Sequence, residues 1–434
     1  MAPAATDVRW PIPARIPPGW ADAEIEPSPP SSGLCFASLL HGDDPMYFVY
    51  AMVLGRRLSQ SLASDSPGVV VDCVLLCGPG CWTRDFGSRR ALVCAGWNRL
   101  VPVDPIEAEH LDGSWTKRHR MVFTKLRVLQ LPYRRVLFLD LDLLPRVGVD
   151  LTELFQVDAP AGKYHGHGFD GSLLAHGAVL PSRLVWDRVW CPNAGVLRLD
   201  PRPGYEARSA QLDDIIADVL VRRGASYLPE QYYLADKLQH WRHIGHQWNW
   251  EVRTESCDPG VLYPVEDAWR AARSYGWAGM HPGQSAAEVL ASVRVWHFSG
   301  QGDTEPRGFM HCSSALETAR LAQCVFASRD PGLVVSSALY EWREALDALQ
   351  LEQASCLGSA LAAAVRQLSL QARQARCDSV FFLCEMCCHP GRLREAAVSL
   401  AGDARLMLAG RRLCPTVWVC AECVVAWIRF RVRR

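Results

Sequence analysis

The sequence predicts an α/β domain in which helices flank a mostly parallel sheet, followed by a helical and cysteine-rich C-terminal extension. Short apolar runs alternate with stretches of helical periodicity between residues 34 and 199, which is the rhythm of α/β proteins. Each predicted strand is apolar throughout, as expected where helices cover both faces of a sheet. Hydrophobic residues make up 49% of the 434 residues, so the chain has enough apolar material for a sizeable core.

The strands and helices follow from these patterns in chain order. Strands are predicted at residues 34–40, 69–77, 100–103, 135–140, 193–199 and 293–298. Helices are predicted at residues 47–62, 116–131, 205–222 and 229–241. The segment 163–192 is rich in glycine and histidine and has no clear periodicity. It is predicted to be a long loop, a kind of segment that often closes over a site.

Changes in composition divide the chain into four segments. Residues 1–33 are predicted to form a disordered, proline-rich leader, and residues 34–312 the single large domain. Residues 313–376 have helical spacing, and residues 377–434 form a cysteine-dense tail.

Charge and cysteine content limit the location and the partners. The 46 basic and 46 acidic residues cancel, so no long-range field draws the protein to nucleic acid. A membrane-spanning segment is not expected, because no run of about 18 apolar residues occurs. The start lacks a signal-peptide pattern, and the 17 cysteines then indicate reduced thiols or metal ligands. We therefore expect a cytoplasmic location; no pattern predicts the oligomeric state.

Two carboxylates follow the apolar strand predicted at residues 135–140. Asp140 and Asp142, separated by Leu141, lie at its carboxyl end, which is the edge of an open α/β sheet where ligands bind. Residues two apart on a strand point to the same side, so both carboxylates can face one cation. Hard oxygen ligands of this kind suit Mn²⁺ or Mg²⁺ shared with phosphate oxygens. The alternative interpretation is an acidic turn without a cation.

Other polar motifs occur in a fixed order along the chain. They are Phe36-Ala37-Ser38-Leu39 with Tyr47 in the helix after it, Thr124-Lys125-Leu126, Asn193-Ala194-Gly195, Glu230-Gln231 and His297-Phe298-Ser299-Gly300. Together with Asp140 and Asp142, this order resembles that of the family 8 glycosyltransferases, the glycogenin-like group, from residue 34 to residue 309.

The resemblance implies a nucleotide-sugar transferase domain of the GT-A type that moves a hexose, in the first place glucose, from a UDP-sugar to a carbohydrate or protein acceptor. It further implies retention of the anomeric configuration and a divalent metal, Mn²⁺ or Mg²⁺, held by Asp140, Asp142 and His297. A neutral imidazole suits manganese better than calcium. Glu230 and Gln231 are then the catalytic candidates near the sugar. The implied donor contacts are Ala37, Ser38, Tyr47, Lys125, Asp140, Leu141, Asp142, Asn193, Ala194, Gly195, His297 and Gly300. Arg307 is a further candidate, which can supply a positive charge to the diphosphate from a position shifted relative to the family's lysine.

Three positions depart from the family pattern. Ala194 stands where the family has serine, and Glu230 stands where it has aspartate, which leaves the donor sugar open. The segment Glu305-Pro306-Arg307 replaces a Lys-Pro-Trp segment whose lysine helps to hold the diphosphate. Arginine and lysine are not equivalent at phosphate sites. These departures favour an alternative, a catalytically degenerate scaffold that only binds a nucleotide sugar.

The route of retention stays open at this stage. A double displacement needs a well-placed nucleophile, and none stands out beyond Glu230 and Gln231. Our preferred hypothesis is attack on the face that the diphosphate leaves, through an oxocarbenium-like transition state.

An apolar strand that ends in Asp-x-Asp also opens the haloacid dehalogenase-type phosphatases. Those proteins have Thr or Val where this chain has Leu144, and their motif lies near the start of the chain. A later lysine and paired aspartates in suitable context are also missing. The sequence therefore disfavours that class.

The acceptor is expected to meet two variable segments, residues 163–192 and 248–284. Trp250, Trp269 and Trp277 in the second segment have faces that commonly stack on sugar rings. Core packing explains these tryptophans equally well.

Two Cys-x-x-Cys pairs mark the tail, and tetrahedral zinc takes four such ligands. One hypothesis is a structural Zn²⁺ site at Cys384, Cys387, Cys420 and Cys423. Apolar runs beside both pairs favour buried thiols equally. A third interpretation is an interfacial anchor at residues 427–434.

Overall fold

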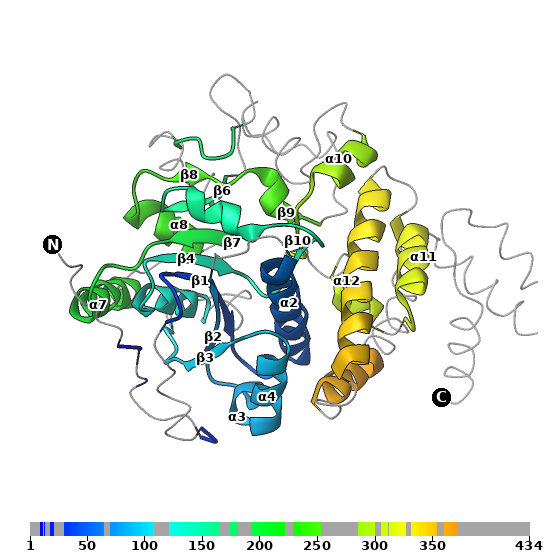
Figure 1. The fold of residues 1–434 in the computed structure, drawn as a ribbon, viewed down its shortest axis with the longest axis horizontal. Helices are drawn as coiled ribbons and strands as arrows, with labels where there is room; N and C mark the ends of the chain where they lie inside the picture. Colours follow the sequence, from blue (N-terminus) through cyan, green and yellow to red (C-terminus); the bar gives the residue numbers. More distant parts are fainter. Residues whose placement is uncertain are drawn as a thin grey trace, which may run out of the picture.

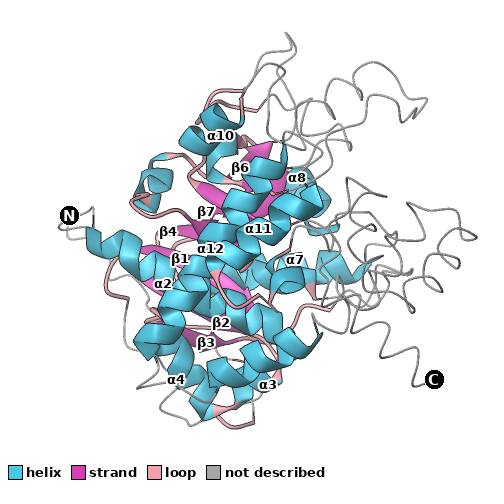
Figure 2. Ribbon diagram, turned by 90° about the vertical axis from the view of Figure 1, so that its right-hand side faces the viewer, coloured by secondary structure: helices cyan, strands magenta, loops and turns pink. Residues whose placement is uncertain are grey.

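A computed structural model gives the fold of the protein. It describes residues 9–11, 13, 18–20, 30–64, 70–107, 121–164, 174–180, 192–221, 229–252, 285–299, 305–310, 312–326, 331–353 and 360–371. Within this part a seven-stranded sheet lies between helices, which confirms the predicted α/β class (Figure 1, Figure 2). The predicted zinc ligands of the tail, Gly300, Trp269 and Trp277 lie outside the described residues.

The large sheet is mainly parallel. Its strands are β1 Leu34–Leu40, β2 Asp72–Cys77, β3 Arg99–Pro102, β4 Arg135–Leu139, β6 Ala161–Tyr164, β7 Pro192–Leu199 and β8 Arg242–His243, in the order β3-β2-β1-β4-β7-β6-β8. The first four in this order are parallel, while β7 runs antiparallel to both of its neighbours. Because of that reversal, the beginning of β7 lies beside the carboxyl end of β4.

A second, three-stranded sheet starts directly after β4. It consists of β5 Leu143–Pro145, β9 Trp250–Glu251 and β10 Val295–His297, in the order β5-β10-β9. Strand β10 is antiparallel to β5 and parallel to β9, and His297 is in register with both Leu143 and Glu251. The sequence predicts only the strand at residues 293–298, because strands of two or three residues are too short to show a period.

Helices cover both faces of the large sheet. The longer elements are α2 Pro45–Ser64, α4 Phe86–Cys94, η1 Val122–Gln130, α7 Tyr205–Val221, α8 Pro229–Lys237, α11 Ala315–Phe326 and α12 Pro331–Gln353. The shorter ones are α3 Cys81–Arg84, η2 Leu151–Gln156, η3 His246–Trp248, α10 Ala286–Ser292 and η4 Pro306–Phe309. Residues 360–371 are also helical. No helix in the described part combines the length and the apolar character needed to cross a bilayer.

The core has two layers that the sheet separates. On β4, Leu137 and Leu139 join the cluster packed by α2 and α12, while Val136 and Phe138 join the cluster packed by η1, α7 and α8. This alternation is the two-residue period of a strand with both faces buried. It explains why the sequence of β4 is apolar without interruption.

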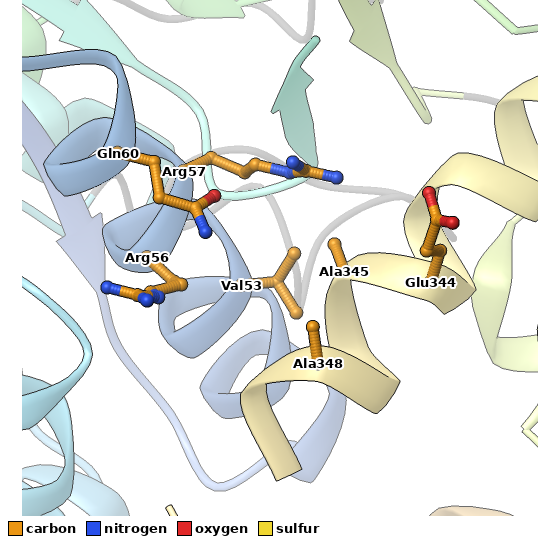
Figure 3. Close-up of a pocket in the computed structure, with 7 residues that line it drawn as sticks. All are labelled: Val53, Arg56, Arg57, Gln60, Glu344, Ala345 and Ala348. Atoms are coloured by element: carbon orange, nitrogen blue, oxygen red, sulfur yellow. The ribbon is translucent and has the colours of Figure 1, made fainter. Parts of the chain in front are cut away.

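Helix α12 lies beside α2 (Figure 1, Figure 2) and completes the first layer. Trp342 of α12 packs edge-on against Tyr50 of α2, with ring centroids 6.0 Å apart. Glu341, next to it, accepts a hydrogen bond of 3.1 Å from the Trp296 indole on β10 and pairs with Arg146 at 3.1 Å. The small side chains of Val53, Ala345 and Ala348 leave a hollow of about 200 Å³ between the two helices (Figure 3).

The structure differs from the sequence predictions at several boundaries. The described part of the helix predicted at residues 116–131 is the 3₁₀ helix η1, and the strand before Asp140 ends at Leu139. Lys163, predicted to open a loop, lies in β6 and is buried. Trp250 is also buried, which favours core packing for this side chain rather than stacking on a sugar.

Candidate active site

The carboxylates of Asp140 and Asp142 meet the imidazole of His297 at the carboxyl end of β4. The backbone N–H of Asp140 donates to the Gly195 carbonyl at 2.8 Å, so the chain leaves β4 beside the start of β7. It then turns, since the Leu143 N–H donates to the Asp140 carbonyl at 3.3 Å. Pairing of β5 with β10 brings His297 across, and the three ligand groups lie within 4.8 Å of one another.

Gly195 makes room for His297. A Cβ atom at this position would lie 2.4 Å from His297 Cε1 and 2.8 Å from Nδ1. The family resemblance implies that Gly195 contacts the donor. In the structure its physical role is to let the imidazole lie close against the backbone of β7.

Asn249 fixes the orientation of His297. Its Oδ1 lies 2.7 Å from His297 Nδ1, while its own Nδ2 donates to Asn193 Oδ1 at 2.8 Å. Because the amide oxygen must accept, Nδ1 carries the proton. His297 Nε2, which lies 3.4 Å from Asp142 Oδ1, is then the atom with a lone pair for a cation.

A buried ion pair, Lys163 with Glu251, contacts both Asn249 and Asn193. Lys163 Nζ lies 2.9 Å from Glu251 Oε2 and donates to the Asn249 carbonyl at 3.0 Å. The other oxygen of Glu251 accepts from Asn193 Nδ2 at 3.4 Å and from the Ser299 hydroxyl at 2.9 Å. Both charged side chains are only 2% exposed, so each depends on the other to remain charged.

Asn249, Glu251 and the contacts of Lys163 with them are not among the residues that the sequence predicts for the site. Asn249 and Glu251 lie around the two-residue strand β9, which shows no periodicity. The signal in the sequence is the alternation Trp248-Asn249-Trp250-Glu251, in which two polar residues alternate with two large apolar ones.

Lys125 stands on the other side of Asp140. Its Nζ lies 3.1 Å from Asp140 Oδ1 and 3.3 Å from Oδ2, and 3.6 Å from Glu230 Oε1. Burial alone would lower the pKa of Lys125, but the carboxylates of Asp140 and Glu230 outweigh it and hold the pKa above the ordinary lysine value. Lys125 is therefore a fixed positive charge beside Asp140.

The electrostatics of Asp140 favour a further cation. Burial raises the pKa of Asp140 above its ordinary value; Lys125 opposes this rise, and the nearby Asp142 carboxylate adds to it. A divalent ion neutralises two clustered carboxylates. Two carboxylates and one correctly oriented imidazole nitrogen fit Mn²⁺ or Mg²⁺ by ligand type and spacing.

The remaining predicted site residues occupy four different places. Ala37, Ser38 and Ala194 are buried in the large sheet, and the Ser38 hydroxyl donates to the Leu139 carbonyl at 2.6 Å. Glu230 and Gln231 open helix α8, and both are buried.

Leu141 is buried in the turn between the two aspartates. Tyr47 and Arg307 lie near the amino end of α2, where Arg307 pairs with Asp44 at 2.5 Å.

No protein-family model and no curated protein sequence match the chain. Solved structures with partial likeness include the galactosyltransferase LgtC in complex with donor and acceptor sugar analogues. The identity to LgtC is 15%, with 72% of this chain and all of that chain covered and a TM-score of 0.38.

The bifunctional glycosyltransferase WbbM is 15% identical over 65% of this chain and 48% of its own length, with a TM-score of 0.40. Mouse xyloside xylosyltransferase 1 is 16% identical over 61% of this chain and 97% of its own length, with a TM-score of 0.34. At these identities and scores the likeness assigns no function to this chain.

Proposed function

We propose that this protein is a metal-dependent, retaining glycosyltransferase that takes a hexose from a UDP-sugar, with UDP-glucose as the first donor to test. One observation carries the proposal. Asp140 and Asp142 meet His297, which is far from them in the sequence, beside the buried Lys125 at the carboxyl end of a parallel strand. This edge of an α/β sheet is where ligands bind, and the group combines cation ligands with a fixed positive charge.

The site suits a diphosphate as the leaving group. Asp140, Asp142 and His297 would hold a divalent cation, which would neutralise the negative charge that builds up on the departing nucleoside diphosphate. Arg307, held at the amino end of α2 by Asp44, is a second basic group for the diphosphate in this proposal. The network of Asn249 and Glu251 keeps His297 oriented, so little reorganisation is needed when the donor binds.

The position of Glu230 favours attack on the face that the diphosphate leaves. Its carboxylate lies 3.6 Å from Lys125 Nζ, so its charge is already shared with a buried cation. A nucleophile for double displacement works better with an unshared electron pair directed at the sugar. In the proposed mechanism Glu230 and Gln231 orient the sugar, and the leaving phosphate takes the proton of the acceptor.

A degenerate scaffold that binds a nucleotide sugar without turnover is the second candidate. It is favoured by Ala194, which lacks a hydroxyl, and by Arg307, whose guanidinium already has a carboxylate partner. The intact set of Asp140, Asp142 and His297 favours the enzyme.

The two candidates separate in one experiment. We expect the protein to release UDP from UDP-glucose or UDP-galactose in the presence of Mn²⁺, and the Asp142→Ala variant to be slower by about a hundredfold or more. Asp158→Ala is the control, because Asp158 is exposed and lies before β6.

Equal rates for Asp142→Ala and wild type would contradict the metal site. Binding of the donor by both proteins with no release would instead indicate the scaffold.

A further inference from the structure

Tyr50 is a buried tyrosine whose hydroxyl has no hydrogen-bond partner in the described part of the chain. The residue is only 4% exposed. Buried hydroxyl groups in proteins are nearly always paired, since an unpaired one has lost its water without compensation. A hydroxyl in this state therefore calls for an explanation, and a bound ligand is one.

Aromatic neighbours hold the Tyr50 ring in place. Trp342 packs against it edge-on at 6.0 Å, and Tyr47, one turn earlier on α2, packs at 6.2 Å. The hydroxyl is thus carried on a rigid element, and rigid donors lose little entropy when they bind a ligand.

Helix α2, which carries Tyr50, lies beside the proposed diphosphate site. Helix α2 packs against β5, which follows Asp142, and its amino end holds Arg307 of η4 through Asp44. The pKa of Tyr50 lies well above its ordinary value, first because of burial and then because of Glu305, Asp142 and Tyr47, with Arg307 opposing. The hydroxyl therefore stays protonated and can donate a hydrogen bond.

We propose that the Tyr50 hydroxyl donates a hydrogen bond to a phosphate oxygen of the nucleotide-sugar donor, so that Tyr50 is a donor-binding residue. The inference rests on the proposed function and adds a contact that none of the sequence motifs contains. A phosphate oxygen is a charged acceptor, which makes the bond strong. Its formation pairs a hydroxyl that is otherwise buried unpaired.

The Tyr50→Phe variant tests the proposal because it removes only the oxygen. We expect the dissociation constant of UDP, measured by calorimetry with Mn²⁺, to rise about tenfold, the usual effect of losing a hydrogen bond to a charged group. The affinity for uridine, which has no phosphate, stays unchanged. Thermal stability stays equal or increases, because an unpaired buried hydroxyl is lost. Tyr340→Phe, on the exposed side of α12, is the matched control.

A loss of UDP affinity without a loss of thermal stability distinguishes a ligand contact from a structural role. Unchanged UDP affinity in Tyr50→Phe would overturn the inference while leaving the proposed function intact. Weaker UDP binding together with lower thermal stability would also overturn it, since the hydroxyl would then support the fold. If the wild-type protein binds no UDP with Mn²⁺, the proposed function fails, and the inference fails with it.

Discussion

Gly195 illustrates how the absence of a side chain can organise a site. His297 Nδ1 and Cε1 lie in the space where a Cβ of residue 195 would be, and Asn193 Oδ1, 2.9 Å from that point, receives the Gly195 N–H. The close approach places the imidazole between β7 and the two aspartates. At this position even a methyl group forces a displacement of His297 or of the backbone of β7.

We expect Gly195→Ala to lower the affinity for Mn²⁺ by about 10- to 100-fold, the usual effect of disturbing the orientation of a metal ligand. Electron paramagnetic resonance of free Mn²⁺ measures this affinity without any turnover. Gly33→Ala is the control, because an added Cβ there meets nothing closer than 3.5 Å. Equal Mn²⁺ affinities in Gly195→Ala and wild type would show that the imidazole is not a ligand.

Single residues of the site could be predicted where they belong to a recognisable sequence motif. Asp140, Asp142, His297 and Lys125 were expected together, and the structure brings them together. Asn249 was not expected, because its role depends on a side chain 48 positions away. Such a contact follows from the packing of three short strands, which leaves no local pattern in the sequence.

At the scale of elements, Asp72 ties the beginning of β2 to three other segments. Its Oδ2 accepts hydrogen bonds from the Tyr133 hydroxyl at 2.7 Å and the Ser31 N–H at 2.8 Å, and it pairs with Arg99 Nε at 3.1 Å. Burial opposes ionisation of Asp72, but the bonds from Tyr133, Ser31 and Arg99 outweigh it, so its pKa is lowered. The carboxylate thereby stabilises the sheet where the parallel strands β1, β2 and β3 begin.

The stabilisation from Asp72 should depend on pH. A lowered native pKa contributes stability that is fully present above the unfolded value, about 3.9, and that is lost as the pH falls through the native pKa. We expect Asp72→Asn to cost about 1–3 kcal/mol at pH 7, and the difference from wild type to shrink below about pH 4. Urea unfolding at both pH values measures this.

Asp158→Asn, at an exposed position, serves as the control for Asp72→Asn and should change little at either pH. A stability difference for Asp72→Asn that stays constant down to pH 3 would mean that the ionised carboxylate is not the stabilising group.

Helices and strands could be predicted where a whole face of the element is buried. Strand β1 has the predicted bounds, Leu34–Leu40, because both of its faces are buried and its sequence is apolar throughout. The small sheet of β5, β9 and β10 depends on pairing between remote segments. No hydrophobic period marks strands of two or three residues, so the way His297 reaches Asp142 could not be foreseen.

At the scale of the whole molecule, the first core layer continues through residue 312 into α12. Leu339, Trp342 and Leu346 of α12 are buried in the same cluster as Phe36 of β1. Glu341 joins α12 to the small sheet through Trp296 and Arg146. The amino-acid composition changes near residue 312, which suggests a domain boundary there. Composition alone does not show that a helix after this point packs into the core of the preceding domain.

A chain that ends at residue 312 should therefore fail to fold cooperatively. Burial of each large apolar side chain contributes about 1.5–3 kcal/mol, and α12 supplies several to the core. Their sum is comparable with the whole stability of a typical domain, about 5–15 kcal/mol. We expect residues 1–312 to show no cooperative thermal transition in calorimetry and no UDP binding, whereas a chain ending at residue 371, which keeps α12, retains both. A cooperative transition at the same temperature in both chains would mean that α12 is an appendage on an independently stable domain, and that Tyr50 does not need Trp342 to hold its position.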